Sequence, residues 1–207
     1  PAGISAAFFL AREGVDVTVF ERKETLGGIV RHVIPEFRIA SEAIDKDISL
    51  CRAMGAKFRT GVEVKSAADL LGQGYTHVIF ATGAWKAGDA HLEYGQALNV
   101  ITFLETAKSD PASLKLGADV AVIGGGNTAM DAARAAKRIP GVERVRLVYR
   151  RDKRNMPADE EELALALEDG VEFMELLSPI GVKDGVLTCR VMELGERDAS
   201  GRRAPVD

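Results

Sequence analysis

The sequence predicts an α/β protein built from two nucleotide-binding units. Three observations lead to this fold class. Short apolar strands alternate with helical segments along most of the chain, a glycine-rich turn joins a strand to a helix at residues 119–138, and the two halves repeat the same order of elements. We therefore expect two Rossmann-like units, over residues 1–84 and residues 85–207, with a polar crossing near residues 84–97.

The first half combines helical periodicity with β-branched runs. The pattern predicts helices over residues 2–13, 41–54 and 66–71, and strands over residues 15–20, 56–59, 62–64 and 77–81. Gly14 is placed to end the first helix, and Ser41 is the expected N-cap of the second. The run 77–81 is apolar throughout, so we expect it to be a buried strand that begins at His77.

The second half predicts helices over residues 99–108, 127–138 and 159–168, and strands over residues 119–123, 145–149 and 171–175. Near the end of the sequence, the alternation of helices and strands gives way to strands alone. Residues 178–183 and 186–195 are expected to be antiparallel strands that turn at Asp184-Gly185, and a further turn is expected at residues 198–201.

The two halves align as copies of one unit. Helix 2–13 and strand 15–20 match helix 127–138 and strand 144–149. With the strand ends superposed, Glu21 corresponds to Arg150. The copies therefore differ at the position that selects the nucleotide.

The glycine turn carries the dinucleotide-binding pattern. Strand 119–123 leads into Gly124-Gly125-Gly126-Asn127-Thr128-Ala129, which fits G-x-G-x-x-A. Gly124 permits the tight turn, Gly126 lets the backbone approach a pyrophosphate, and small Ala129 lets the helix pack close to the strand. The helix N-terminus then offers free N–H groups to the phosphates. The alternative is a glycine turn that serves packing alone.

The residues after the second strand favour NADPH. An acid at this position would bind the ribose 2′-hydroxyl and select NAD, whereas this sequence has Arg150-Arg151. Guanidinium groups suit a 2′-phosphate by charge and by bidentate geometry. The alternative is a solvated basic turn. In the first copy, Gly3 takes the place of the third small residue, and Glu21 is either a ribose ligand or a surface residue.

Composition excludes several functions. The 207 residues carry a net charge of -4, so no basic field favours nucleic acid, and no apolar run reaches the ~20 residues that span a bilayer. The two cysteines, Cys51 and Cys189, form no C-x-x-C and are expected to be buried thiols of a cytoplasmic protein. No metal-ligand spacing and no catalytic Ser–His–Asp or paired carboxylates are seen. Trp85 is expected to pack between the domains.

Several motifs together resemble the glutamate synthase small-subunit family. They run through the chain in order: Pro1-Ala2-Gly3-Ile4-Ser5-Ala6-Ala7, Val17-Thr18-Val19-Phe20-Glu21, Leu26-Gly27-Gly28, Ile34-Pro35-Glu36-Phe37-Arg38, Ala81-Thr82-Gly83, residues 122–131, Val148-Tyr149-Arg150-Arg151 and Asn155-Met156-Pro157-Ala158. The tail, with residues 191–196 and 201–203, is most similar to the branch named after selenate reductase subunits.

The resemblance implies a flavoprotein of the glutathione reductase type, in which an NADPH domain is inserted into an FAD domain. NADPH would reduce FAD, and electrons would pass through iron–sulfur clusters outside this chain to a larger partner subunit or domain. By position, the FAD residues would be Gly3, Glu21, Gly28, Val64, Ala81, Thr82 and Gly83. The NADPH residues would be Gly124, Gly126, Asn127, Thr128, Ala129, Arg150 and Arg151. The segment 34–38 lies near the flavin or forms a rigid loop.

Compared with this family, the chain is expected to be a fragment. The first FAD strand with its Gly-x-Gly, the cysteine-rich cluster domain and the last NADPH-domain strand are not in the sequence. The FAD site is therefore expected to be incomplete. Two other functions stay open: a non-catalytic nucleotide-binding or docking module, and another flavin reductase of the same architecture.

Overall fold

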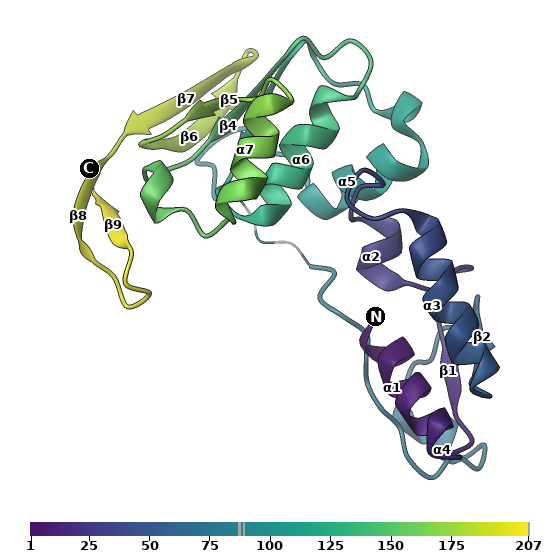
Figure 1. The fold of residues 1–207 in the computed structure, drawn as a ribbon. Coiled ribbons are helices and arrows are strands. Elements are labelled where there is room, and N and C mark those ends of the chain that lie inside the picture. Colours follow the sequence, from purple (N-terminus) through teal and green to yellow (C-terminus); the bar gives the residue numbers. More distant parts are fainter. Residues whose placement is uncertain (87, 89, 207) are drawn as a thin grey trace. The chain divides into compact units, whose positions relative to one another are not determined.

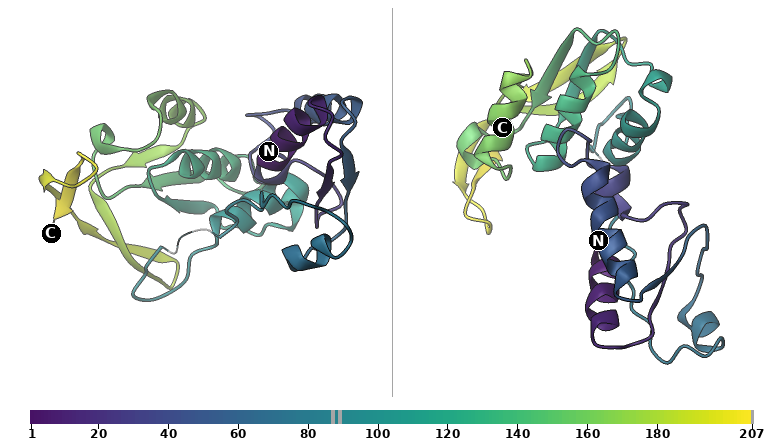
Figure 2. Two further views of the ribbon diagram at one scale, coloured as in Figure 1. Left: turned by 90° about the horizontal axis from the view of Figure 1, so that it is seen from below. Right: turned by 45° about the vertical axis from the view of Figure 1, so that its right-hand side comes forward.

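The computed structural model describes residues 1–86, 88 and 90–206. The chain forms two compact units, Pro1–Trp85 and Lys86–Asp207. Figures 1 and 2 show the elements of each unit. Both units combine helices with parallel strands, so the α/β class is confirmed.

The first unit contains a pair of parallel strands flanked by helices. Its elements are α1 (Ala2–Arg12), β1 (Thr18–Phe20), α2 (Gly28–His32), α3 (Ser41–Ala53), β2 (Lys57–Arg59) and α4 (Ala67–Leu71). Strands β1 and β2 pair with Thr18 opposite Lys57. Helix α1 gives way to Gly14, whose φ of +80° is a conformation that glycine adopts without strain.

Two small apolar clusters hold this unit together. The first contains buried Ala7 of α1, Cys51 of α3 and Ala56. The second contains Leu26 with Ile44 and Ile48 of α3. Helix α3 contributes to both clusters, so it is the central packing element of the unit.

The start of α3 differs from the sequence prediction. Ser41 is the first helical residue, not the N-cap, which is Ala40 without a side-chain cap. Glu36 takes over the capping, because its Oε1 accepts a hydrogen bond from the Ser41 N–H at 2.7 Å. A carboxylate at this end of a helix is also favoured by the helix dipole.

The predicted strands over residues 62–64 and 77–81 are wrong for this structure. Residues 77–81 pair with no other segment in the described part of the chain, and Ile79 and Phe80 are 62% and 72% exposed. A strand forms only where a second backbone satisfies its N–H and C=O groups, so an apolar run alone does not suffice. His77 correspondingly does not begin a strand but lies exposed beside the Thr76 hydroxyl.

The second unit is built on a three-stranded parallel sheet, in the order β3–β4–β5. Its elements up to this sheet's last strand are α5 (Val100–Ser109), η1 (Pro111–Ser113), β3 (Asp119–Ile123), α6 (Asn127–Lys137), β4 (Arg144–Val148), η2 (Lys153–Asn155), α7 (Glu160–Glu168) and β5 (Glu172–Met174). Leu104, Met130, Val145 and Leu147 are its largest fully buried side chains. They come from α5, α6 and β4, so the sheet and two helices share one core.

Two antiparallel hairpins follow: β6 (Leu177–Lys183) with β7 (Val186–Val191), and β8 (Glu193–Arg197) with β9 (Arg203–Val206). The first turns at Asp184-Gly185 as predicted, with both residues at positive φ. The single strand predicted over residues 186–195 is wrong. It is divided at Met192, which is buried and whose N–H donates to the Leu176 carbonyl at 2.8 Å.

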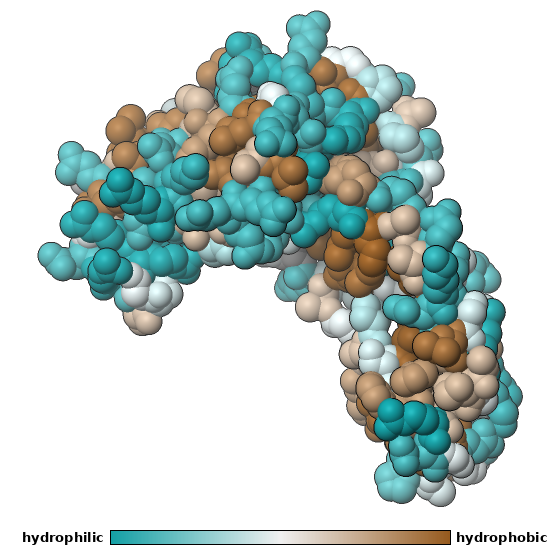
Figure 3. All heavy atoms as spheres, in the orientation of Figure 1, coloured by the Kyte–Doolittle hydropathy of each residue, from teal (hydrophilic) through white to brown (hydrophobic). Residues whose placement is uncertain are grey.

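On the surface, apolar side chains lie scattered among hydrophilic ones in both units (Figure 3). Exposed apolar residues include Phe9 and Leu50 in the first unit and Val186 and Val191 in the second. Among the described residues, no helix has both the length and the apolar character that crossing a bilayer would require.

Candidate nucleotide-binding site

The glycine turn connects β3 to α6 in the conformation that the sequence pattern predicts. Gly124 has a φ of +138°, and its N–H donates to the Val148 carbonyl of β4 at 3.0 Å. A Cβ on Gly124 would lie 3.2 Å from the Cβ of Ala129. Small residues at both positions therefore allow the helix to begin close to the ends of the two strands.

The middle glycine has a role that sequence reasoning missed. A Cβ on Gly125 would lie 2.5 Å from Cε2 of Tyr149, so the ring of Tyr149 occupies that space. Tyr149 is buried, and its hydroxyl donates to the Asn155 carbonyl at 2.8 Å. The signal was present in the sequence, because three successive glycines exceed the two that the pattern requires.

The turn leaves donors available for an anion. Within the described part of the chain, no hydrogen bond engages the backbone N–H of Gly126, Asn127 or Thr128. The nearest atom to a Cβ built on Gly126 is Pro157 Cγ, at 4.0 Å. These open donors lie at the positive end of the eleven-residue helix α6. The residues therefore fit the pyrophosphate of a dinucleotide.

The side chain of Asn127 is engaged elsewhere. Its Nδ2 donates to Asp159 Oδ2 at 2.9 Å, and its Oδ1 accepts from the Asp159 N–H at 3.1 Å. Asn127 thus ties the start of α6 to the start of α7. Only its backbone N–H is left to face a phosphate.

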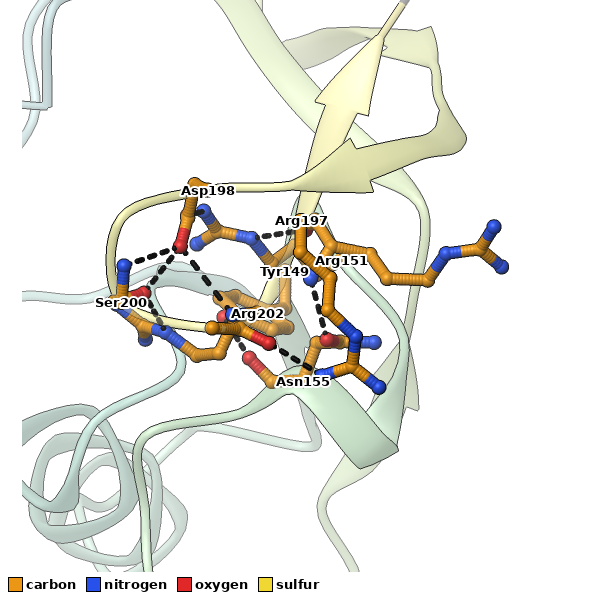
Figure 4. Close-up of polar contacts among 9 residues, drawn as sticks. Tyr149, Arg151, Asn155, Arg197, Asp198, Ser200 and Arg202 are labelled. Carbon is orange, nitrogen blue, oxygen red and sulfur yellow. Dashed lines mark hydrogen bonds and ion pairs between the residues drawn. The ribbon is translucent and has the colours of Figure 1, made fainter.

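The two predicted phosphate-binding arginines have opposite surroundings. Arg150 is exposed and pairs with no other residue that the structure describes. Arg151 is buried, and its Nη2 donates to Asp198 Oδ2 at 2.6 Å while its Nε donates to the Arg203 carbonyl at 2.8 Å (Figure 4). Arg150 is therefore available to a ligand, whereas Arg151 already has protein partners.

Two of the predicted FAD residues, Gly3 and Ala81, lie side by side in the first unit. A Cβ on Gly3 would lie 3.3 Å from the Cβ of Ala81, and a Cβ on Gly28 would lie 3.2 Å from Pro1 Cδ. Both glycines therefore sit where a neighbouring segment approaches closely. Thr82 and Gly83 follow Ala81 directly, and all three are exposed.

Glu21 directly follows β1, and Val64 lies in the segment after β2. The Oε1 of Glu21 accepts from the Lys23 N–H at 2.9 Å, and its carbonyl accepts from the Val62 N–H at 2.9 Å. Val64 follows two residues later and is half-buried. The carboxylate keeps Oε2 as a further acceptor, which suits a ribose hydroxyl.

Trp85, which is predicted to pack between the domains, has several neighbours in the first unit. It packs within the first unit, where Lys23 Nζ lies 5.1 Å and Arg22 Cζ lies 5.9 Å from the ring centroid. The His32 ring is 6.5 Å away. Cations favour an aromatic face, so these neighbours account for the position.

Comparison with known proteins identifies the family. Residues 1–176 match the model of the pyridine nucleotide-disulphide oxidoreductases. The chain belongs to this family. The glycine turn between β3 and α6 is consistent with this membership.

Two relatives show which members of this family the chain resembles. The chain is 48% identical to "Putative oxidoreductase YgfK" of Escherichia coli (strain K12), with all of this chain and 20% of that protein covered. It is 35% identical to the glutamate synthase [NADPH] small chain of Azospirillum brasilense, with 99% of this chain and 46% of that one covered. The predicted resemblance to glutamate synthase small subunits is thereby confirmed. The chain spans less than half the length of these relatives.

A solved structure supports the fold. That of 2-naphthoyl-CoA reductase superposes with a TM-score of 0.71 at 20% identity, over 100% of this chain and 30% of that one. At this identity the similarity establishes the architecture alone. The roles of individual residues stay predictions.

Proposed function

We propose that the chain is the nucleotide-binding part of an NADPH-dependent flavoprotein that delivers electrons to a larger partner subunit or domain. The supporting observation is the turn Gly124–Gly126. Among the described residues, the backbone N–H groups of Gly126, Asn127 and Thr128 have no hydrogen-bond acceptor, and the Tyr149 ring, next in sequence to exposed Arg150, lies against Gly125. The name of the Azospirillum relative contains both NADPH and a small chain, which agrees with this proposal. Bound flavin would supply the hydride and electron chemistry, and the chain would supply binding and orientation.

The geometry of the turn supports a specific set of proposed NADPH contacts. Gly124, Gly126 and the backbone of Asn127 and Thr128 would hold the pyrophosphate, and Ala129 would keep α6 close to the sheet. Arg150 would bind the 2′-phosphate. Its guanidinium can donate two parallel hydrogen bonds to phosphate oxygens.

The proposed FAD contacts lie in the first unit. Glu21 would accept from ribose hydroxyls and Val64 would meet the adenine through its backbone. Gly3, Gly28 and Ala81-Thr82-Gly83 would border the isoalloxazine and phosphates. The close approach of Gly3 to Ala81 supports a shared site. The iron–sulfur clusters of the proposed electron path would lie outside this chain. The two free cysteines support a cytoplasmic location.

Direct binding tests the cofactor assignment. We expect the purified protein to bind NADPH more tightly than NADH, and Arg150→Ala to weaken NADPH binding about tenfold to a hundredfold, as expected for a charge-assisted contact. NADH binding should be unchanged. Lys115→Ala, which removes an exposed charge elsewhere in the second unit, is the matched control. An Arg150→Ala variant that binds NADPH as tightly as the wild-type protein does would contradict the assignment.

A second measurement separates catalysis from simple binding. A flavin-containing preparation that reduces a dye with NADPH would support the electron-transfer function. Tight nucleotide binding without any dye reduction would instead support the docking-module alternative.

A further inference from the structure

We propose that the β8–β9 hairpin determines cofactor specificity at the proposed NADPH site, with Arg151 as a positioning residue and not a phosphate ligand. Asp198 holds Arg151, and this contact fixes the loop that presents Arg150 to the 2′-phosphate. The proposal rests on the proposed function, because it assigns Arg150 to that phosphate.

The hairpin contacts the loop after β4 at two places. Asp198 and the Arg203 carbonyl both accept from the guanidinium of Arg151, at 2.6 Å and 2.8 Å. The Arg203 N–H in turn donates to Asn155 Oδ1 at 2.8 Å. Figure 4 shows the turn of the hairpin beside Arg151 and Asn155. Residues 151 and 155 are thus both attached to one hairpin.

Asp198 is arranged by its own turn to accept this arginine. Its Oδ1 accepts from the Ser200 N–H at 2.9 Å, from the Ser200 hydroxyl and from the Arg202 N–H at 3.3 Å. Its Oδ2 is left for Arg151. These hydrogen bonds, first that of the Ser200 hydroxyl and then the backbone bonds and the charge of Arg151, lower the pKa of Asp198, so the carboxylate is ionised at neutral pH.

Burial distinguishes the two arginines. The side chain of Arg151 is 8% exposed and that of Asp198 is 29% exposed. Moving Arg151 to a ligand would break a largely buried ion pair and leave an acid without its partner, which is unfavourable. Arg150 is exposed and has no partner within the described chain, so binding a phosphate breaks no existing contact.

The same loop contacts the glycine turn at both of its ends, through Tyr149 and Ala158. The Ala158 N–H donates to the Gly125 carbonyl at 3.0 Å, and the Tyr149 ring lies against Gly125. Arg150 therefore lies between two residues that are held in place: Tyr149, which contacts the glycine turn, and Arg151, which is bonded to the β8–β9 hairpin. Because the loop is held in this way, the backbone around Arg150 loses less conformational entropy when a ligand binds.

Asp198→Asn tests the proposal, with Asp184→Asn in the turn of the β6–β7 hairpin as the matched control. The readout is the ratio of the NADH and NADPH dissociation constants, supplemented by the affinity for 2′,5′-ADP. We expect Asp198→Asn to reduce this ratio about tenfold by weakening NADPH binding, with NADH affinity unchanged. A merely structural role would weaken both nucleotides equally, or neither, and would overturn the proposal.

Other outcomes are equally decisive. Tighter NADPH binding by Asp198→Asn would mean that Arg151 is a phosphate ligand restrained by Asp198, which contradicts the positioning role.

If Asp198→Asn fails to fold, Ser200→Ala removes one donor to Asp198 at an exposed turn, and Ser113→Ala is its control. We then expect a two- to threefold fall in the ratio, on the order of 0.5 kcal/mol, and an unchanged ratio would overturn the proposal. Arg150→Ala distinguishes a failure of the proposed function from a failure of the hairpin's role. If Arg150→Ala leaves the preference for NADPH over NADH intact, the proposed function fails. If Arg150→Ala changes this preference but Asp198→Asn does not, only the hairpin's role is refuted.

Discussion

Single residues in the glycine turn each meet a different steric demand. Gly124 has a positive φ, Gly125 gives its side-chain space to the Tyr149 ring, and Gly126 leaves space open beside free N–H groups. The sequence pattern accounts for the first and the third. The second depends on a residue 24 positions further along the chain, because Tyr149 reaches back over the turn from the end of β4.

We expect Gly125→Ala to destabilise the second unit by about 1–3 kcal/mol, the cost of overpacking a filled space. The Tyr149 ring is buried and its hydroxyl is bonded, so it has little freedom to move away. Urea unfolding measures the effect, and NADPH affinity should fall with it. Gly117→Ala is the control, since the nearest atom to its Cβ is 3.7 Å away. Equal stability of the two variants would contradict this account of the turn.

At the scale of elements, charged side chains fasten helices α6 and α7 to each other. Asp169, at the end of α7, accepts from Arg134 Nε and Arg138 Nη1, both at 2.7 Å. The Arg134 side chain is only 10% exposed. The hydrogen bond from Arg138, and then that from Arg134, lowers the pKa of Asp169 below its ordinary value despite partial burial.

Asp169→Asn should therefore destabilise the second unit by about 2 kcal/mol at pH 7, somewhat less than for a fully buried pair. Because the folded-state pKa of Asp169 is lowered, the ion pairs stabilise the fold above the ordinary aspartate pKa of about 4. Their contribution is lost as the pH falls through the folded-state pKa. Urea unfolding from pH 7 to pH 3 should show the difference between wild type and variant shrinking below about pH 4.

The control for this prediction is Asp119→Asn. Asp119 also accepts from two arginines, Arg144 and Arg146, but its side chain is 49% exposed. Solvent screens such a pair, so a smaller change is expected. A larger loss from Asp119→Asn, or a difference for Asp169→Asn that grows in acid, would contradict the argument.

At the scale of the whole molecule, the chain consists of two units with separate cores. The candidate NADPH site lies within the second unit, at the glycine turn and the loop after β4. Ligand binding stabilises the state that it selects by a free energy fixed by concentration and affinity, about 2.7 kcal/mol at a hundred times the dissociation constant.

We accordingly expect saturating NADPH to slow amide hydrogen exchange at residues 124–130 and 149–158. Helix α3 of the first unit should exchange at its original rate. NADH at the same concentration should protect the glycine turn but not residues 149–158. Protection confined to the first unit, or spread evenly over both, would contradict the location of the site.

How much the sequence could predict depends on the range of the interactions involved. The order of elements from α5 to β5 and the turn at Gly124 follow from local patterns, because hydrophobic period, helix ends and positive φ are set by neighbouring residues. The run 77–81 was misjudged, since a strand requires a partner backbone. The break at Met192 was also missed, because it depends on Leu176, which is distant in sequence.

The paired arginines show most clearly which features the sequence predicts and which depend on contacts between distant segments. The sequence by itself determined that two cations follow β4, at the position where a nucleotide-binding unit reads the ribose. Only the tertiary structure decided that they differ, because Asp198 and Arg203, 47 and 52 residues further along, bury Arg151 and leave Arg150 exposed. Charge and spacing are properties of the chain, whereas the partner that a charge finds depends on which distant segment folds against it.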